Sequence, residues 1–211
     1  TGFTGPEQVE YALARGHRVT VINRNRTRPD FFRGKGEVEQ LVGDLNADMS
    51  ALQGRTFDAV VDIPTTAPAW VRNVAQYMKG RTKHYTFIST LSVYADNSQP
   101  GLDESSPTLP MPADVDPFSP DPAMRGRYYG ALKAYSEQFV RETYPESLII
   151  RPGLIVGPVL GPLLRAAVGV ARVAVARVTR APGRCAGAAA DRTGPVGGGI
   201  YPVAAGANCG F

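Results

Sequence analysis

Cysteine and histidine are scarce in this chain of 211 residues, which contains two of each. Both cysteines, Cys185 and Cys209, lie near the C-terminal end. The rest of the chain therefore has no disulfide framework and no cysteine-based metal site. His84 has no carboxylate or cysteine at the spacing of metal ligands, so we predict no metal.

Long apolar runs are also missing. No stretch reaches the roughly 20 residues that a membrane-spanning helix needs, so we predict no membrane partner and a cytoplasmic location. The hydrophobic fraction of 43% can support a packed core, and the length is typical of one domain.

Acidic residues and lysine are nearly absent from residues 159–211, which hold six arginines and one acid, Asp191. This segment sets the basic pI of about 9.2, because residues 1–158 carry nearly equal numbers of the two charges. Nucleic-acid binding depends on neutralising phosphates, so we predict no nucleic-acid partner. The oligomeric state is left open.

The chain begins on a glycine-rich turn, "TGFTG", with Gly2 and Gly5 three residues apart. An amphipathic run follows and ends at Gly16, a predicted C-cap, before a β-branched strand at 17–22. Turn, helix and strand match the later part of a dinucleotide-binding βαβ unit, in which glycine lets the backbone approach the pyrophosphate. A glycine turn that caps another kind of helix is the alternative. We expect the strand that opens such a unit to lie before Thr1, which leaves a targeting segment open.

Strands and helices alternate along the next part of the chain. Predicted strands lie at 38–45, 57–63, 84–90 and 147–156, and predicted helices at 69–80 and 130–144. This alternation predicts an α/β fold with a doubly wound, parallel Rossmann-type sheet that lacks its first strand. Without that central strand, we expect the strands at 17–22 and 38–45 to lose their bridge to the strand at 57–63.

Seven prolines lie between Pro100 and Pro122, which predicts a long surface loop there. Asp62, at the end of a buried strand, is interpreted mainly as a turn residue before Pro64. Contact with substrate or ribose is the alternative for Asp62.

Two features carry candidate chemistry. Tyr129 and Lys133 are four residues apart on one predicted helix and therefore share a face. An ammonium beside a phenol favours the phenolate, which suits Tyr129 to proton transfer near neutral pH. Hydroxyl groups in "FISTLSVY", among them that of Thr90, follow a strand at the edge where α/β proteins bind ligands. The alternative for Tyr129 and Lys133 is an ordinary surface pair. The alternative for the hydroxyl groups is capping of the local turn.

The segments "TGFTG", "FISTLSVY", "YGALK" and "RPGLIVGP", in this order, resemble the extended short-chain dehydrogenase/reductases, the NAD(P)-dependent epimerase/dehydratase family. The resemblance covers residues 1 to about 157. It implies that Gly2 and Gly5 are the last two glycines of the cofactor turn. It implies a catalytic triad of Thr90, Tyr129 and Lys133, in which Lys133 also holds the nicotinamide ribose.

The resemblance also assigns two further cofactor contacts. Arg151 and Pro152 match a segment near the nicotinamide, and Asp44 matches an acid that faces adenine. Asp44 could equally cap the next turn. Asn23 stands where an NAD enzyme usually has an acid, and Arg24 follows it. Losing the carboxylate and gaining a guanidinium favours a 2′-phosphate, so the predicted cofactor is NADP, with NAD possible.

The predicted function is NAD(P)-dependent oxidation and reduction, or epimerisation and dehydration, of a small-molecule substrate with a hydroxyl or carbonyl group. The alternatives are a dinucleotide-binding regulator without turnover, an RNA-binding relative, and an inactive fragment. The identity of the substrate and the direction of the reaction stay open.

The composition changes after Pro158. Residues 159–211 are dominated by alanine, glycine, valine and arginine. We divide the chain into a Rossmann domain at 1–158 and a tail at 159–211. We expect the tail to be the product of a shifted reading frame, to form no complete substrate domain and to carry no site.

Overall fold

The computed structural model describes residues 4–26, 32, 34, 37–64, 67–98, 100–153 and 155, together with the backbone of 174–175. These residues all lie in one compact unit, Thr1–Ala181. Gly2 and most of the tail lie outside the described residues, and so does the expected boundary at residue 158.

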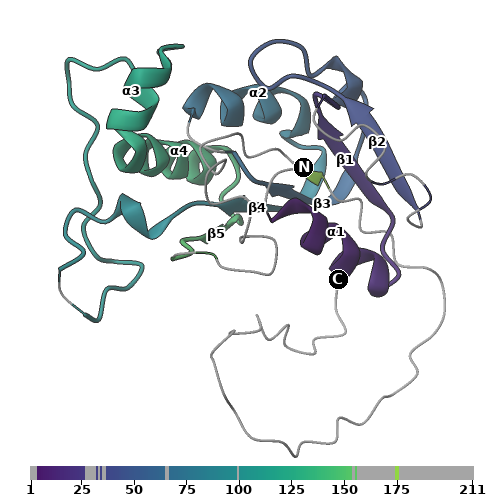
Figure 1. Cartoon of the computed structure of the whole chain (residues 1–211), viewed down its shortest axis with the longest axis horizontal. Coiled ribbons are helices and arrows are strands. Elements are labelled where there is room, and N and C mark those ends of the chain that lie inside the picture. Colours follow the sequence, from purple (N-terminus) through teal and green to yellow (C-terminus); the bar gives the residue numbers. More distant parts are fainter. Residues whose placement is uncertain are drawn as a thin grey trace, which may run out of the picture. The chain divides into compact units, whose positions relative to one another are not determined.

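The described residues form a six-stranded sheet in the order β2-β1-β6-β3-β4-β5 (Figure 1). The five longer strands are β1 (Val19–Asn23), β2 (Val38–Val42), β3 (Phe57–Asp62), β4 (Thr82–Ile88) and β5 (Leu148–Ile150). Neighbours among them pair in parallel: β1 with β2, β3 with β4, and β4 with β5. The predicted strands are therefore confirmed in type, although β2 and β5 are shorter than expected.

The shortest strand, β6 (Ala174–Val175), lies between β1 and β3 and runs antiparallel to both. It pairs with Thr20 and Val21 on one side and with Val61 on the other. The expectation that β1 and β2 lose their bridge to β3 is therefore wrong at these positions. A short segment of the tail supplies backbone hydrogen-bonding groups there.

Helices cover both faces of the sheet (Figure 1). Helix α1 (Gly5–Ala14) contributes Val9 to a core cluster with Val19 and Val21 of β1. Helices α2 (Pro68–Met78) and α4 (Tyr129–Thr143) contribute to a separate cluster that contains Ile22 of β1. Successive residues of a strand point to opposite faces of the sheet. Because β1 is buried throughout, it contributes side chains to both clusters. This arrangement confirms the doubly wound α/β fold.

Helix boundaries follow local sequence signals. The C-cap of α1 is Arg15, one residue before the predicted Gly16, which follows with a φ of +76° and donates its N–H to the carbonyl of Leu13. Helix α3 (Pro122–Arg127) begins where a continuous loop was expected to end. The carboxylate of Asp121 accepts a hydrogen bond from the N–H of Ala123 at 2.9 Å, and proline is favourable in a first turn.

The proline-rich segment leaves the 3₁₀ helix η2 (Leu91–Val93) and returns beside it. Tyr94 and Thr108 form an isolated antiparallel bridge. Two backbone hydrogen bonds close this neck, from Ala95 to Pro107 at 2.9 Å and from Leu109 to Val93 at 2.7 Å. Between the neck and α3 the described chain contains neither helix nor strand, which confirms the predicted loop.

Candidate active site

The predicted site residues lie on two parts of the same sheet edge. Parallel strands end at a common edge, which is where ligands bind in α/β proteins. The candidates at or just beyond strand ends are Asn23 and Arg24 after β1, Asp44 after β2, Thr90 after β4, and Arg151 and Pro152 after β5. Gly5 is buried at the start of α1, and Tyr129 and Lys133 lie on α4.

Lys133 is the most constrained of these residues. Its side chain is 1% exposed, and its ammonium donates to the backbone carbonyl of Ile88 at 2.6 Å and to that of Pro64 at 3.2 Å. It also lies 4.4 Å from the centroid of the Phe87 ring. Burial lowers the pKa of Lys133 to about 8, although the charges of Asp62 and Glu137 oppose the shift.

Tyr129 opens α4 one helical turn before Lys133, and its side chain is 37% exposed. Gly130, the residue after Tyr129, lies where this end of α4 packs against η2. A Cβ at Gly130 would lie 2.1 Å from the carbonyl oxygen of Ser92. The absence of a side chain at Gly130 therefore allows α4 to pack on the backbone that follows Thr90.

Thr90 is the N-cap of η2, and its hydroxyl oxygen accepts a hydrogen bond from the N–H of Ser92 at 3.2 Å. The expected local capping is thus present. A longer contact of 3.3 Å joins the hydroxyl groups of Thr90 and Ser92. In that contact the Thr90 hydroxyl donates to Ser92 Oγ, so donation of its proton to a ligand would replace this long hydrogen bond.

Arg151 is held by α4. Its guanidinium makes a two-pronged ion pair with Glu137, at 3.0 Å from Nε and 2.7 Å from Nη2, and lies 4.8 Å from the Tyr94 ring centroid. The carbonyl of Pro152 accepts from the N–H of Leu91 at 3.0 Å. Both predicted cofactor residues therefore tie the end of β5 to the elements around Thr90.

Glu137 is the buried carboxylate that balances the positive charge of Arg151. Burial disfavours its charge, but hydrogen bonding from Arg151 and the charges of Arg151 and Arg141 outweigh burial and keep the pKa of Glu137 below its usual value. Arg141 pairs with the same carboxylate at 3.2 Å.

Asp62 is fully buried, and its Oδ2 accepts a hydrogen bond from the Tyr85 hydroxyl at 2.5 Å. Burial raises the pKa of Asp62 to about 6, whereas the Tyr85 hydrogen bond and the charge of Lys133 act to lower it. The prediction of a turn role for Asp62 is wrong, because its carboxylate points into the core and bonds to β4.

The cofactor candidates near β1 and β2 are held by local contacts. The Oδ1 atom of Asn23 accepts from the N–H of Asn25 at 2.6 Å. Arg24 is half-buried and has no ion-pair partner among the described residues. Asp44 accepts from the N–H of Asn46 at 3.0 Å, which is the turn cap considered as its alternative role.

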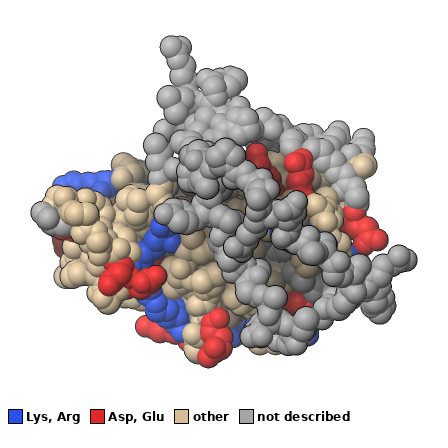
Figure 2. All heavy atoms as spheres, turned by 90° about the horizontal axis from the view of Figure 1, so that it is seen from below, with Lys and Arg blue, Asp and Glu red and all other residues tan. Residues whose placement is uncertain are grey.

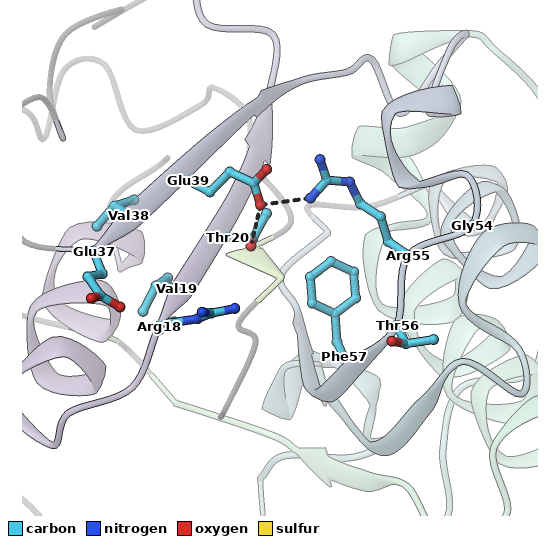
Figure 3. Close-up of a pocket in the computed structure, with 10 residues that line it drawn as sticks. All are labelled: Arg18, Val19, Thr20, Glu37, Val38, Glu39, Gly54, Arg55, Thr56 and Phe57. Carbon is cyan, nitrogen blue, oxygen red and sulfur yellow. Dashed lines mark hydrogen bonds and ion pairs between the residues drawn. The ribbon is translucent and has the colours of Figure 1, made fainter. Parts of the chain in front are cut away.

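A hollow at the opposite edge of the sheet is drawn in Figure 3. Its lining includes the first residues of three strands, Val19, Val38 and Phe57. Glu39 crosses it, accepting from Thr20 at 3.0 Å and pairing with Arg55 at 2.7 Å. Since ligands of α/β sheets bind at the carboxyl ends of strands, we do not assign the reaction to this hollow.

Three observations concern metal ions, membranes and surface charge in the described part of the chain. Within it, no group of three or more histidine, cysteine or acidic side chains could hold a metal ion. None of its helices combines the length and apolar character needed to cross a membrane. In Figure 2, Lys and Arg side chains are interspersed with Asp and Glu on the described part of one face.

Of two further residues in this region, Glu137 was not predicted as part of the site, and Asp62 was considered only as an alternative contact to substrate or ribose. Glu137 had a usable signal: Lys133, Glu137 and Arg141 follow at intervals of four, so one face of α4 carries alternating charge. Asp62 had a weaker signal, a carboxylate inside the apolar run "FDAVVDI".

Comparison with known proteins supports the fold. No family model and no curated protein sequence matches the chain. Among solved structures, the chain is similar to a UDP-galactose 4-epimerase, with a TM-score of 0.52 and 21% sequence identity. The match covers 79% of this chain and 61% of the epimerase chain, so this chain spans less than two thirds of its neighbour. At this identity, the similarity establishes a Rossmann-type α/β fold.

Proposed function

We propose that the chain is an NAD(P)-dependent oxidoreductase or epimerase/dehydratase that acts on a hydroxyl or carbonyl substrate through Thr90, Tyr129 and Lys133. The observation that carries the proposal is the setting of Lys133. Its ammonium is fixed between the ends of β3 and β4, one helical turn from a half-exposed tyrosine. The epimerase fold neighbour supports the same class of reaction.

The residues at the start of α1 fit the pyrophosphate of a nicotinamide dinucleotide. Gly5 lies at the N-terminus of α1, and the side chain of the N-cap Thr4 makes no capping hydrogen bond, so backbone N–H groups are available to a pyrophosphate. Lys133 would hold the nicotinamide ribose, as the family resemblance implies. A bound nicotinamide supplies the hydride chemistry that side chains cannot.

The side chains of this chain would manage the proton and the substrate oxygen. Tyr129 would give a proton to that oxygen or take one from it, with Lys133 one helical turn further along α4. Thr90 would donate a hydrogen bond to the same oxygen while Ser92 continues to bond its lone pair.

NADP is the cofactor that we propose for this site. Asn23 puts no negative charge beside the 2′ position, and Arg24 has no ion-pair partner among the described residues. A guanidinium can bind a phosphate through two parallel hydrogen bonds, so Arg24 suits a 2′-phosphate.

The test measures binding and hydride transfer separately. NADPH binding to the chain is followed by fluorescence, and transfer of deuterium from C4-labelled NADPH to a panel of ketones, aldehydes and nucleotide-linked sugars is followed by mass spectrometry. Tyr129→Phe is expected to lower transfer by at least about 100-fold and to leave the Kd for NADPH within about threefold.

Tyr128→Phe is the matched control, because it removes the neighbouring hydroxyl from the same helix end and is expected to keep transfer. Undiminished transfer in Tyr129→Phe would refute the assignment. Binding of NADPH without transfer to any compound would favour the dinucleotide-binding regulator.

A further inference from the structure

Asp62 is a buried carboxylate whose charge is only partly balanced by hydrogen bonds. Tyr85 of β4 donates to its Oδ2, whereas its Oδ1 has no hydrogen-bond partner among the described residues. The Tyr85 ring stacks on Tyr144 at the end of α4, with centroids 4.0 Å apart. The hydrogen bond from Tyr85 therefore satisfies one oxygen of the carboxylate and leaves the other without a partner.

Lys133 is the cation that acts on this carboxylate, through space rather than by an ion pair, since its ammonium donates to backbone carbonyls instead. The two partners that its ammonium contacts, the carbonyls of Pro64 and Ile88, are neutral. Pro64 lies two residues beyond Asp62, so the ammonium is anchored to the segment that the carboxylate ends. The charge of Asp62 raises the pKa of Lys133, and the charge of Lys133 lowers that of Asp62.

The other nearby carboxylate is already committed. Glu137, on the next turn of α4, is bound by Arg151 of the segment after β5 and by Arg141 of its own helix. Its negative charge also favours the ammonium of Lys133, but two arginines share it. Tyr85 and Tyr144 are neutral at physiological pH, because burial raises the pKa of each above its ordinary value. Asp62 is thus the nearby carboxylate that balances the charge of Lys133 without being paired to an arginine.

We infer that Asp62 is a positioning residue for the proposed reaction: its buried carboxylate keeps the ammonium of Lys133 charged, and so keeps Lys133 able to serve Tyr129. The inference deepens the proposed function and rests on it. Asp62 touches neither Tyr129 nor the substrate in this scheme and acts only through Lys133.

The two ionisations define a pH window. Asp62 is charged above a pKa of about 6, and Lys133 is charged below a pKa of about 8. Both groups are therefore ionised mainly between these values. When Asp62 is replaced by neutral asparagine, the ammonium loses its counter-charge and Lys133 becomes neutral at lower pH.

The titration of Lys133 can be measured without cofactor or substrate. The full chain has four lysines, so carbon-13 labelling of lysine Cε gives a simple spectrum, and Lys133→Met assigns the signal. Asp62→Asn is expected to lower the pKa of Lys133 by about one unit or more. Asp58→Asn is the matched control, because it removes the same charge from the same strand at an ion pair with the exposed Lys83.

An unchanged titration of Lys133 in folded Asp62→Asn would overturn the inference. If that variant does not fold, Tyr85→Phe replaces it. Losing the Tyr85 hydroxyl makes the Asp62 carboxylate harder to ionise, so the pKa of Lys133 is expected to fall by a smaller amount in the same direction. No change in folded Tyr85→Phe would then count against the inference.

Turnover distinguishes this inference from the proposed function. If the chain transfers hydride, the alkaline limb of its pH profile is expected to move to lower pH in Asp62→Asn by the same amount as the lysine titration. An unmoved limb would overturn the positioning role even if the titration shifts. Absence of transfer in the unchanged chain would refute the proposed function, and the titration would still report whether the two charges are coupled.

Discussion

The two parts of the sheet edge are built differently. Around α4, Lys133 and Arg151 are fixed by partners on other elements, through hydrogen bonds from 2.6 to 3.2 Å and a two-pronged ion pair. Beyond β1 and β2, the side chains of Asn23 and Asp44 form hydrogen bonds to residues two positions further along the chain. The groups proposed for chemistry are therefore positioned by the core, and those proposed for cofactor choice are positioned by their own loops. Substitutions in the two parts should differ in both kind and size.

The largest effect is expected where α4 meets η2. Gly130→Ala would place a Cβ 2.1 Å from a backbone carbonyl, which cannot turn away as a side chain would. We expect a loss of unfolding free energy of about 3 kcal/mol, and a loss of turnover of about 100-fold as Tyr129 moves relative to Thr90. Urea unfolding followed by circular dichroism, together with the deuterium-transfer assay, measures both effects.

Gly126→Ala in α3 is the control for that change, since a Cβ there meets no atom within 4 Å. It is expected to be neutral or slightly stabilising, because alanine is the better helix former. Equal stability and activity of the two variants would show that the close approach at Gly130 has no role.

The next effect concerns the pH dependence of stability. The pKa of Asp62 is raised from 3.8 to about 6, so the folded chain binds more protons than the unfolded chain between these values. The resulting contribution of Asp62 to the free energy of unfolding is fully present below pH 3.8 and is lost as pH rises through about 6. By linkage it amounts to about 3 kcal/mol.

The difference in unfolding free energy between the unchanged chain and Asp62→Asn, measured by urea titration from pH 4 to pH 6, reports this term at pH values where Lys133 stays charged. Groups that titrate equally in both chains cancel. Parallel pH curves for the two chains would show that Asp62 is not buried as a carboxylate in solution.

The smallest effect is expected at the loop after β1. Arg24→Glu places a negative charge where we propose the 2′-phosphate, so NADPH binding should weaken about tenfold more than NADH binding. Fluorescence titration with each cofactor measures the ratio. Arg18→Glu makes the same charge change at the opposite edge and should leave the ratio unchanged. An equal loss for both cofactors in Arg24→Glu would remove it from the phosphate site.

The sequence predicted the secondary-structure elements better than it predicted which segments pair with one another. Period and composition located β3 and α4 to within one residue, because a continuous apolar run and helical spacing are local properties. Helix α3 was missed, although the pair Asp121 and Pro122 is a standard helix start, because the surrounding prolines favoured a loop. The bridge made by β6 had no local signal, since strand pairing joins residues far apart in sequence.

The site shows the same division. Tyr129 and Lys133 could be paired from their spacing alone, since four residues make about one helical turn. The carbonyl partners of Lys133 could not, because they come from two strands that the fold brings together. Arg151 was noticed through the family resemblance, but its ion pair with Glu137 is a tertiary contact with no counterpart in the spacing of the two residues.

The neck between Tyr94 and Thr108 has a consequence for how this molecule could diversify. Its two backbone hydrogen bonds hold the ends of the intervening loop together, and neither bond involves a residue inside that loop. The entropy of closing a loop rises only slowly with its length, so residues can be added or removed between 96 and 106 at small cost. Thr90 lies on one side of the neck and α4 on the other, so such changes would vary the loop while leaving both in place.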